Sequence, residues 1–346
     1  MTTLSTMDAF DEQDLTVART PTQEAWRRFK KDKLGLVFLV VIAIYFLVAL
    51  WAGTFGWGGS YEVAGQTRPA YEASMGQLGI QLDGKPFPES QVPPTLAGGA
   101  NTILGTDALG RSVFYRGLQS TKVAFIVGTF GALLSVVIGM TLGLLAGFLG
   151  GWVDRVVVFV YSTLASIPYL LLMLAIAFVV KKGDFADWYD DLKFRDFDVS
   201  DFISLGLLNL VVVIGLTSWV TLCRLVRAEV FKVRELDYVN AARSLGFGTG
   251  RILFRHVLPN VFHLVIINFS LTFVIAIKSE VILTFLGVGV DKEPSWGQTI
   301  AGAKNELMTG IWWPLATAGT LLFGLTLAVN YVGDALRDAL DPKLKT

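Results

Sequence analysis

Six long apolar stretches limit how this chain can fold. A helix needs about 20 mostly apolar residues to cross a bilayer, and six stretches satisfy that length: roughly 34–51, 123–147, 156–180, 202–223, 261–284 and 311–332. None shows the alternating pattern of about ten residues that is typical of a membrane β-barrel strand. We therefore predict an all-α integral membrane protein, a bundle of six transmembrane helices.

The overall composition agrees with a membrane protein. Hydrophobic residues make up 53% of the chain and charged residues 17%, whereas charged residues make up about a quarter of a soluble domain. The formal net charge is +0, so the composition gives no reason to expect nucleic acid as a partner. The single cysteine, Cys223, excludes an internal disulfide and a cysteine-rich metal site. The first apolar run begins near Leu34, too far along the chain for a cleavable signal peptide.

The distribution of lysine and arginine predicts the orientation. An even number of spans places both termini on one side, and that side, with the segment 224–255, holds more Lys and Arg than the other. Because positively charged loops stay in the cytoplasm, we expect both termini and this segment to be cytoplasmic.

The chain then divides into five parts. They are a cytoplasmic tail, 1–33; the first transmembrane helix, 34–52; an extracytoplasmic loop, 53–122; a core of five transmembrane helices, 123–333, with a cytoplasmic hairpin at 235–260; and a cytoplasmic tail, 334–346. In the first tail, Trp26 and Phe29 lie three apart among basic residues, which favours an amphipathic helix on the membrane surface. The alternative is a charged flank that only orients the first span.

Small residues and a proline interrupt the second and third spans. Gly139, Gly143 and Gly147 recur every four residues on one helix face, a spacing that lets helices approach closely in lipid. A glycine surface lining a translocation path is the alternative. Pro168 lies in the middle of the third span and predicts a kink there. The kink could shape a pore or serve packing alone.

Charged residues inside the spans are few. Lys278 and Glu280 lie near the outer end of the fifth span, and two residues apart they point to different sides of a helix, so we expect no ion pair between them. The spans lack the series of acids that a proton-coupled carrier uses. The chain also lacks a G-x-x-x-x-G-K-[ST] loop, so an ATP-driven transporter would need a separate ATPase subunit.

An enzymatic function is not predicted. His256 and His263 do not form an H-E-x-x-H pair, and no G-x-S-x-G sequence occurs. We expect no catalytic residues, no metal and no cofactor on this chain.

A polar segment, 237–260, lies between two apolar spans. Asp237 suits the first turn of a helix, Ala241 and Ala242 provide a surface with little side chain, and Gly246 permits a turn. A second helix, with the sequence GRILFRHVL, should follow and end at Pro259. This helix-turn-helix shape would fit a groove on a soluble partner. The alternative is a solvated basic loop that only orients the spans.

These residues resemble a known motif. Ala241-Ala242, Gly246 and Leu258-Pro259 are similar to the EAA motif of ATP-binding cassette (ABC) importer permeases, with Asn240 in the place of the usual preceding acid. The stretch LGTDALGRSVFYRG, 104–117, resembles the LGTDxxGRDxxSR signature of the C-type permeases of the dipeptide/oligopeptide/nickel group. Its matching residues are Gly105, Thr106, Asp107, Gly110, Arg111 and Arg116. Ser112 and Tyr115 depart from that signature.

Three further stretches resemble the same group. They are GFLGGWVD at 147–154, FLGVGV followed by PSWG within 285–297, and GDALRDALDPKL at 333–344. The resemblance runs from about Trp26 to the end of the chain, apart from the outer loops.

The resemblance implies a type I ABC importer permease fold in the bacterial cytoplasmic (inner) membrane. It implies three kinds of partner besides lipid: a second homologous permease, two ATP-binding subunits that hold ATP and Mg, and an extracytoplasmic binding protein that delivers peptides or peptide-like cargo. The segment at 104–116 would support the binding-protein dock or an outer gate. The residues implied to couple to the ATPases are Asp237, Asn240, Ala241, Ala242, Ser244, Leu245, Gly246, Phe247 and Gly250. An ion-coupled secondary transporter remains the alternative function.

Overall fold

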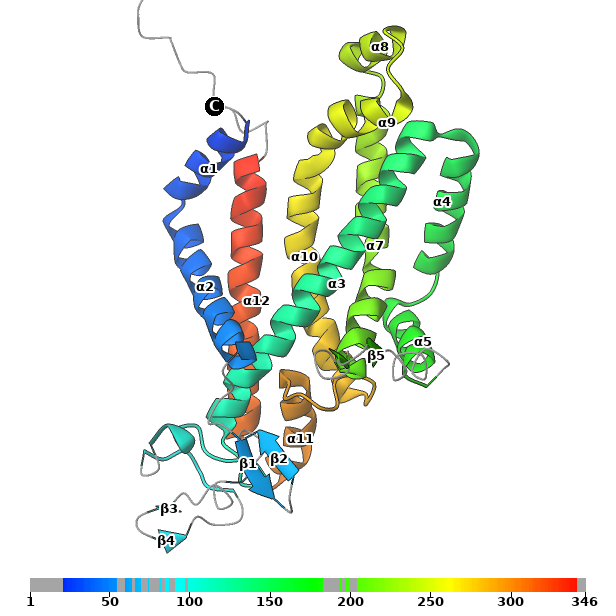
Figure 1. Ribbon diagram of the computed structural model, residues 1–346. Coiled ribbons are helices and arrows are strands. Elements are labelled where there is room, and N and C mark those ends of the chain that lie inside the picture. The colour runs from blue at the N-terminus through cyan, green and yellow to red at the C-terminus, as the bar shows by residue number, and fades with distance from the viewer. Residues whose placement is uncertain are drawn as a thin grey trace, which may run out of the picture.

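The computed structural model of the protein is a bundle of long helices (Figure 1). The structure describes residues 21–54, 60–63, 66–69, 74, 81–82, 85–86, 91–96, 99–182, 193–194, 197–198 and 204–340. The predicted tails therefore lie outside the described residues at 1–20 and 341–346, as does much of the predicted loop at 53–122.

The helices and strands follow one another along the chain. The helices are α1 (Pro21–Lys31), α2 (Lys33–Thr54), α3 (Val113–Leu149), α4 (Gly151–Ala165), α5 (Tyr169–Lys182), α7 (Leu205–Val233), α8 (Asp237–Ser244), α9 (Thr249–Ile252), α10 (Leu258–Phe285), α11 (Trp296–Met308) and α12 (Trp313–Leu340). Short 3-10 and π-helical segments occupy Gly99–Asn101 and Leu253–Val257. Three antiparallel hairpins are formed by β1 (Ser60–Val63) with β2 (Gln66–Pro69), β3 (Gln81–Leu82) with β4 (Lys85–Pro86), and β5 (Lys193–Phe194) with β6 (Phe197–Asp198).

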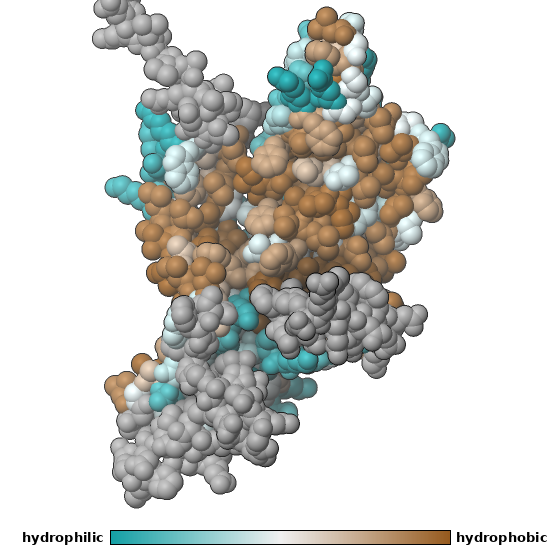
Figure 2. Space-filling view, in the orientation of Figure 1, coloured by the Kyte–Doolittle hydropathy of each residue, from teal (hydrophilic) through white to brown (hydrophobic). Residues whose placement is uncertain are grey.

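The predicted number of spans agrees with the helices. Five described segments are long and apolar enough to cross a membrane, and a sixth span arises if α4 and α5 are counted together. Figure 2 shows the corresponding apolar belt around the described part of the bundle. The α8–α9 hairpin, α1 and the C-terminal end of α12 lie at one end of the bundle, and α11 and the β1–β2 hairpin lie at the other (Figure 1).

The third span is broken rather than kinked, which corrects the prediction from Pro168. α4 ends at Ala165, α5 begins at Tyr169, and their axes differ by 97°. Pro168 has no backbone N–H to donate and cannot continue α4. The Ser166 hydroxyl donates to the Thr163 carbonyl at 2.7 Å, and this local bond satisfies part of the last turn of α4.

α3 begins ten residues before the predicted second span, inside the segment 53–122 assigned to a loop. This additional stretch carries several polar residues that the rest of the protein buries. Gln119 Nε2 donates to the Ala52 carbonyl at 3.2 Å, and Trp296 Nε1 donates to the Gly117 carbonyl at 2.9 Å. Hydropathy alone does not detect a helix whose polar turns are satisfied by neighbouring helices.

The closest helix packing in the bundle joins α3 to α7. A Cβ atom added at Gly139 would lie 2.7 Å from the Trp219 carbonyl oxygen, and one added at Gly143 would lie 2.8 Å from the Cys223 carbonyl oxygen. At Gly147 the added atom would lie 2.7 Å from Val230 Cβ. All three glycines therefore occupy the α3–α7 contact, where the backbones approach too closely for any side chain.

The amphipathic helix predicted near the N-terminus is α1, and part of its apolar face packs on protein. Phe29 is 2% exposed and lies in a cluster with Val332 and Ala339 of α12. Trp26 is half exposed, stacks on Phe29 at 5.8 Å and carries Lys30 over its ring. α1 is thus fastened to the bundle through Phe29, and Trp26 and its basic neighbours stay on the surface.

Candidate functional site

The α8–α9 hairpin projects beyond the apolar belt (Figures 1 and 2). Val239 and Ala242 of α8 are buried. They share a core cluster with Ile252 of α9, with Val257 of the π-helical segment and with Val230 of α7. The hairpin is therefore a small packed unit built on the end of α7 rather than a solvated loop.

This packing changes the role expected of the two alanines. Ala241 is exposed, but Ala242 is only 4% exposed because it faces the inside of the hairpin. The pair therefore does not form one open docking surface. Ala241 remains available to a partner, whereas Ala242 holds α8 against α9.

Gly246 ends α8 in a left-handed conformation, with φ +78°. The Gly246 amide donates to the Arg243 carbonyl at 3.0 Å, and the Phe247 amide donates to the Ala242 carbonyl at 3.2 Å. These two bonds form a Schellman motif, which favours glycine because a side chain is strained at positive φ. Gly248 precedes α9 with φ −64° and does not need this freedom.

The turn leaves apolar side chains on the surface. Leu245 is 74% exposed, and Phe247 and Phe254 are also exposed. Ser244 and Gly250 are exposed beside them, and Asp237 starts α8. Asn240 donates from Nδ2 to the Glu235 carbonyl at 3.2 Å, a contact within the base of the hairpin. The predicted coupling residues therefore lie together in one hairpin, with Ala242 alone among them buried.

Polar contacts fasten the base of the hairpin to the bundle. Arg234 Nη1 donates to the Gly147 carbonyl at the end of α3, at 2.9 Å, and Arg227 Nη2 donates to Asp154 Oδ2 of α4, at 2.8 Å. Asn260 Nδ2 donates to the Tyr238 hydroxyl at 3.0 Å and so ties α10 to α8. α8 is therefore joined directly to α10, and the end of α7 that precedes it is joined to α3 and α4.

The second arm of the hairpin runs directly into α10, which corrects the prediction that Pro259 ends it. Residues 249–285 form one apolar helical segment, with a π-helical turn at Leu253–Val257. Pro259 lies in the first turn of α10, where a missing N–H is tolerated. Single π-helical turns occur often at functional positions within helices. Here the turn lies where the hairpin passes into the span.

At the opposite end, the predicted signature segment forms a compact clasp, which we define as residues 105–116. Asp107 accepts from the Arg111 amide at 2.9 Å and from Arg111 Nε at 2.8 Å, and it lies 3.8 Å from Arg116 Nε. Gly105 and Gly110 both have positive φ, at +74° and +69°. These contacts explain the spacing of the glycines and the charged residues by local geometry.

The clasp also binds neighbouring helices. The Thr106 carbonyl accepts from Trp313 Nε1 of α12 at 2.9 Å, and the Ala108 amide donates to Glu306 Oε1 of α11 at 2.9 Å. A Cβ at Gly105 would lie 2.7 Å from Trp313 Nε1, so a larger residue does not fit there. The clasp therefore fixes the start of α3 to α11 and α12.

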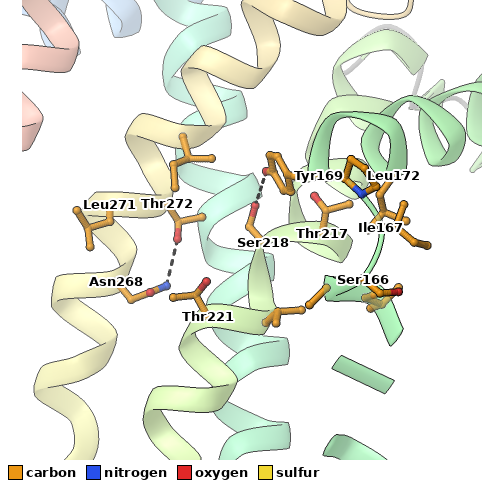
Figure 3. A pocket seen from close by; sticks show the side chains of 15 residues that line it. Ser166, Ile167, Tyr169, Leu172, Thr217, Ser218, Thr221, Asn268, Leu271 and Thr272 are labelled. Atoms are coloured by element: carbon orange, nitrogen blue, oxygen red, sulfur yellow. Dashed lines mark hydrogen bonds between the residues drawn. The ribbon is translucent and has the colours of Figure 1, made fainter. Parts of the chain in front are cut away.

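A pocket of ≈ 750 Å³ lies between the α4–α5 break, α7 and α10 (Figure 3). Polar side chains face it within a mostly apolar lining. Tyr169 and Ser218 share a hydrogen bond of 3.0 Å, and Asn268 Nδ2 donates to Thr272 Oγ1 at 3.1 Å. Sequence reasoning did not identify this pocket. The sequence features that could have indicated the pocket are the hydroxyl and amide side chains inside otherwise apolar spans, together with Pro168.

Lys278 and Glu280 occupy opposite environments on α10, in agreement with the expectation that they do not pair. Glu280 is buried, and its Oε1 accepts from Thr284 Oγ1 at 3.0 Å. A Cβ at Gly297, in the first turn of α11, would lie 3.0 Å from the same oxygen. Glu280 thus belongs to the α10–α11 contact, whereas Lys278 is exposed.

The fold and these features define a multi-pass helical permease with a hairpin at one end of its spans. A family model described as "Binding-protein-dependent transport system inner membrane component" matches residues 139–346, and one described as "N-terminal TM domain of oligopeptide transport permease C" matches residues 20–68. The chain belongs to the first of these families, the inner-membrane permeases of ABC importers.

Relatives of similar length support this assignment. The chain is 30% identical to the dipeptide transport system permease protein of Bacillus subtilis (strain 168), over 94% of this chain and 86% of that protein. It is 31% identical to the glutathione transport system permease protein of Pectobacterium atrosepticum, over 95% and 93% of the two chains. The oligopeptide transport system permease protein of B. subtilis is 29% identical, over 93% and 90%. None of these similarities supports an ion-coupled carrier.

Proposed function

We propose that this chain is one of two homologous permeases that form the pathway of an ATP-driven importer of peptides or peptide-like molecules. Relatives named for dipeptide, glutathione and oligopeptide transport support this class of cargo. The observation that carries the proposal is the hairpin: its exposed apolar tip continues through one helical segment into α10, which lines the pocket.

The hairpin is the contact for an ATP-binding subunit. Leu245 and Phe247 are apolar, exposed and held by a rigid turn, which suits insertion into a groove. Two such subunits would bind ATP and Mg, and ATP binding would bring the two subunits together. This closure would move the hairpins of the two permeases toward one another.

The movement reaches the pathway through helices. Residues 249–285 are continuous, so a displacement of α9 shifts α10 and with it the wall formed by Asn268 and Thr272. Arg227 and Arg234 carry the same displacement to α4 and α3. Packed helices of this kind move as rigid bodies with two discrete arrangements, which alternating access requires.

The Lys and Arg distribution supports a cytoplasmic position for the hairpin and both termini. The clasp and α11 then face the extracytoplasmic side, where a binding protein would deliver cargo. The clasp keeps the outer end of α3 fixed while the hairpin end moves.

Reconstitution of the complete importer tests the proposal. The permease pair, the ATPase subunits and the binding protein are placed in proteoliposomes, and uptake of radiolabelled trialanine and dialanine is measured. We expect uptake to require internal ATP and to be lost without the ATPase subunits. Uptake that runs on a proton or sodium gradient, with no ATPase subunit present, would show that the proposal is wrong.

A further inference from the structure

α10 has one face that the described chain leaves uncovered. Between residues 268 and 285 its exposed positions are Leu271, Ile275, Lys278, Ile282 and Phe285, which are separated alternately by four and three residues. This spacing places all five on one face of a helix. The remaining positions of this stretch are buried or partly buried by the rest of the bundle. We call these five residues the α10 stripe.

The inner part of the α10 stripe lines the pocket. Leu271 and Ile275 belong to the pocket wall together with Asn268 and Thr272 of the same helix (Figure 3). Lys278 follows Ile275 by three residues, about 4.5 Å along the helix axis at 1.5 Å per residue. The lysine therefore lies on the pocket-lining face, just beyond the pocket and toward the clasp end of the bundle.

Lys278 has no ionic partner among the described residues. The described ion pairs on this side join Lys181 to Asp291 at 2.8 Å, and Arg111 and Arg116 to Asp107 at 2.8 Å and 3.8 Å. The carboxylate nearest in sequence, Glu280, points into the α10–α11 contact. A cation in a span is expensive unless it faces a hydrated path or a partner, and such a residue is a functional candidate.

We propose that Lys278 recognises a carboxylate of the cargo as it passes between the two permeases. The inference rests on the function proposed above, because it takes the α10 stripe as a wall of the pathway. The neutral hydroxyl and amide groups of the pocket suit a peptide backbone, and the ammonium group adds attraction for a negative charge. Every unblocked peptide carries a carboxylate at its C-terminus, so one lysine serves cargo of many sequences.

Charge replacement at a single cysteine tests this role. The chain has one cysteine, Cys223, which is buried, so Cys223→Ala gives a parent form of this chain without a thiol, to which Lys278→Cys is added. In the assembled importer, modification by 2-aminoethyl methanethiosulfonate restores an ammonium group at that position. Modification by the membrane-impermeant 2-sulfonatoethyl reagent introduces an anion.

We expect Lys278→Cys to lower trialanine uptake at low concentration about tenfold, the loss of one charge-assisted hydrogen bond. The aminoethyl reagent should restore most of the uptake, and the sulfonatoethyl reagent should lower it further. Lys304→Gln is the matched control, since it removes an exposed lysine of α11 away from the stripe, and its uptake should equal that of the parent.

Blocked peptides identify the carboxylate. Trialanine amide has none, and its uptake should be unchanged by Lys278→Cys. The amide of Ala-Glu-Ala carries only a side-chain carboxylate, so sensitivity to the variant there extends recognition to side chains, and insensitivity restricts it to the C-terminus. Either result agrees with a carboxylate site, and equal loss for trialanine and its amide contradicts it.

Three results would overturn the proposal. The first is a cysteine at position 278 that the sulfonatoethyl reagent never reaches in any nucleotide state, which indicates lipid or a sealed contact. The second is a modified cysteine whose charge has no effect on uptake. The third is reduced recovery of the second permease with Lys278→Cys, which indicates a structural ion pair. Absence of ATP-dependent uptake in the Cys223→Ala parent and the unmodified importer would instead contradict the proposed function itself.

Discussion

The two ends of the bundle use their motif residues differently. In the clasp, Asp107 is surrounded by its own hydrogen-bond donors, and the segment is fixed to Trp313 and Glu306 of neighbouring helices. In the α8–α9 hairpin, internal bonds build a rigid turn, but Leu245 and Phe247 remain exposed beyond it. The charged side chains of the clasp pair with one another within this chain, whereas the hairpin presents apolar groups that the described residues leave uncovered.

This difference predicts different consequences of mutation. Changes in the clasp should reduce stability, with transport lost as a consequence. Changes at the hairpin tip should leave stability unaltered and remove the connection to the ATPase. Changes at the buried residues inside the hairpin should reduce stability, as changes in the clasp do.

The largest effect is expected for Ala242→Arg. The side chain is buried among Val239, Ile252 and Val257, so an arginine there leaves an unpaired charge in an apolar cluster or forces the hairpin open. We expect a loss of about 4 kcal/mol or more in stability. Thermal unfolding of the purified chain in detergent measures it.

Ala241→Arg is the control, because Ala241 lies next in sequence and is exposed. Its unfolding temperature should stay at the wild-type value. If both arginine variants were equally stable, the packing of Ala242 inside the hairpin would be contradicted.

The second prediction concerns the clasp and Asp107→Ala. The change removes the acceptor of the Arg111 guanidinium and of the Arg111 and Leu109 amides. Because those donors lose a charged partner in a mostly buried site, we expect a loss of about 3 kcal/mol. Limited proteolysis should show earlier cleavage within 105–112.

Glu306→Gln provides the graded comparison for the clasp. Its carbonyl oxygen can still accept from the Ala108 amide, so its proteolysis rate should lie close to the wild-type rate. Wild-type resistance of Asp107→Ala would mean that the clasp does not depend on its carboxylate.

The sequence identified these regions, but it did not show how their residues are oriented. The turn at Gly246 was predictable, because a glycine that follows a helix commonly ends it through local hydrogen bonds. The Schellman bonds of Gly246 and Phe247 are bonds of this kind. The side of α8 that faces inward depends on α7 and α9, so the burial of Ala242 could not be read from an Ala-Ala pair. The break at Pro168 and the early start of α3 at Val113 likewise depend on contacts between distant helices.

The pocket shows the same limit. Its wall combines the α4–α5 break, α7 and α10, which are more than fifty residues apart in the chain at their extremes. A hydropathy pattern marks each span but contains no information on which faces meet. The spans and the family motifs were therefore predictable, whereas the residues that line the pocket could be identified only from the packed structure.

The third prediction is a smaller effect within the hairpin turn. Gly246→Ala places a side chain at φ +78°, which costs about 1 kcal/mol. Gly248→Ala is matched to it, because neither glycine has a neighbour within 4 Å of an added Cβ and only Gly246 has positive φ. Hydrogen exchange of the Phe247 amide should accelerate about fivefold in the first variant and stay unchanged in the second. Equal exchange in the two variants would contradict a conformational role for Gly246.

The smallest effect on stability, and the sharpest test of the comparison, is expected for Leu245→Asp. Leu245 is 74% exposed, so its replacement should change the free energy of unfolding by no more than about 0.5 kcal/mol. Leu109→Asp in the clasp is the matched variant, since Leu109 is 61% exposed at the other end of the bundle. Both should unfold at the wild-type temperature. Only Leu245→Asp should lose the ATPase subunits on affinity purification, because a carboxylate does not enter an apolar groove without a partner. If Leu109→Asp lost the ATPase subunits and Leu245→Asp kept them, the ATPase would dock at the clasp end, and the assignment of the docking surface to the hairpin would be wrong.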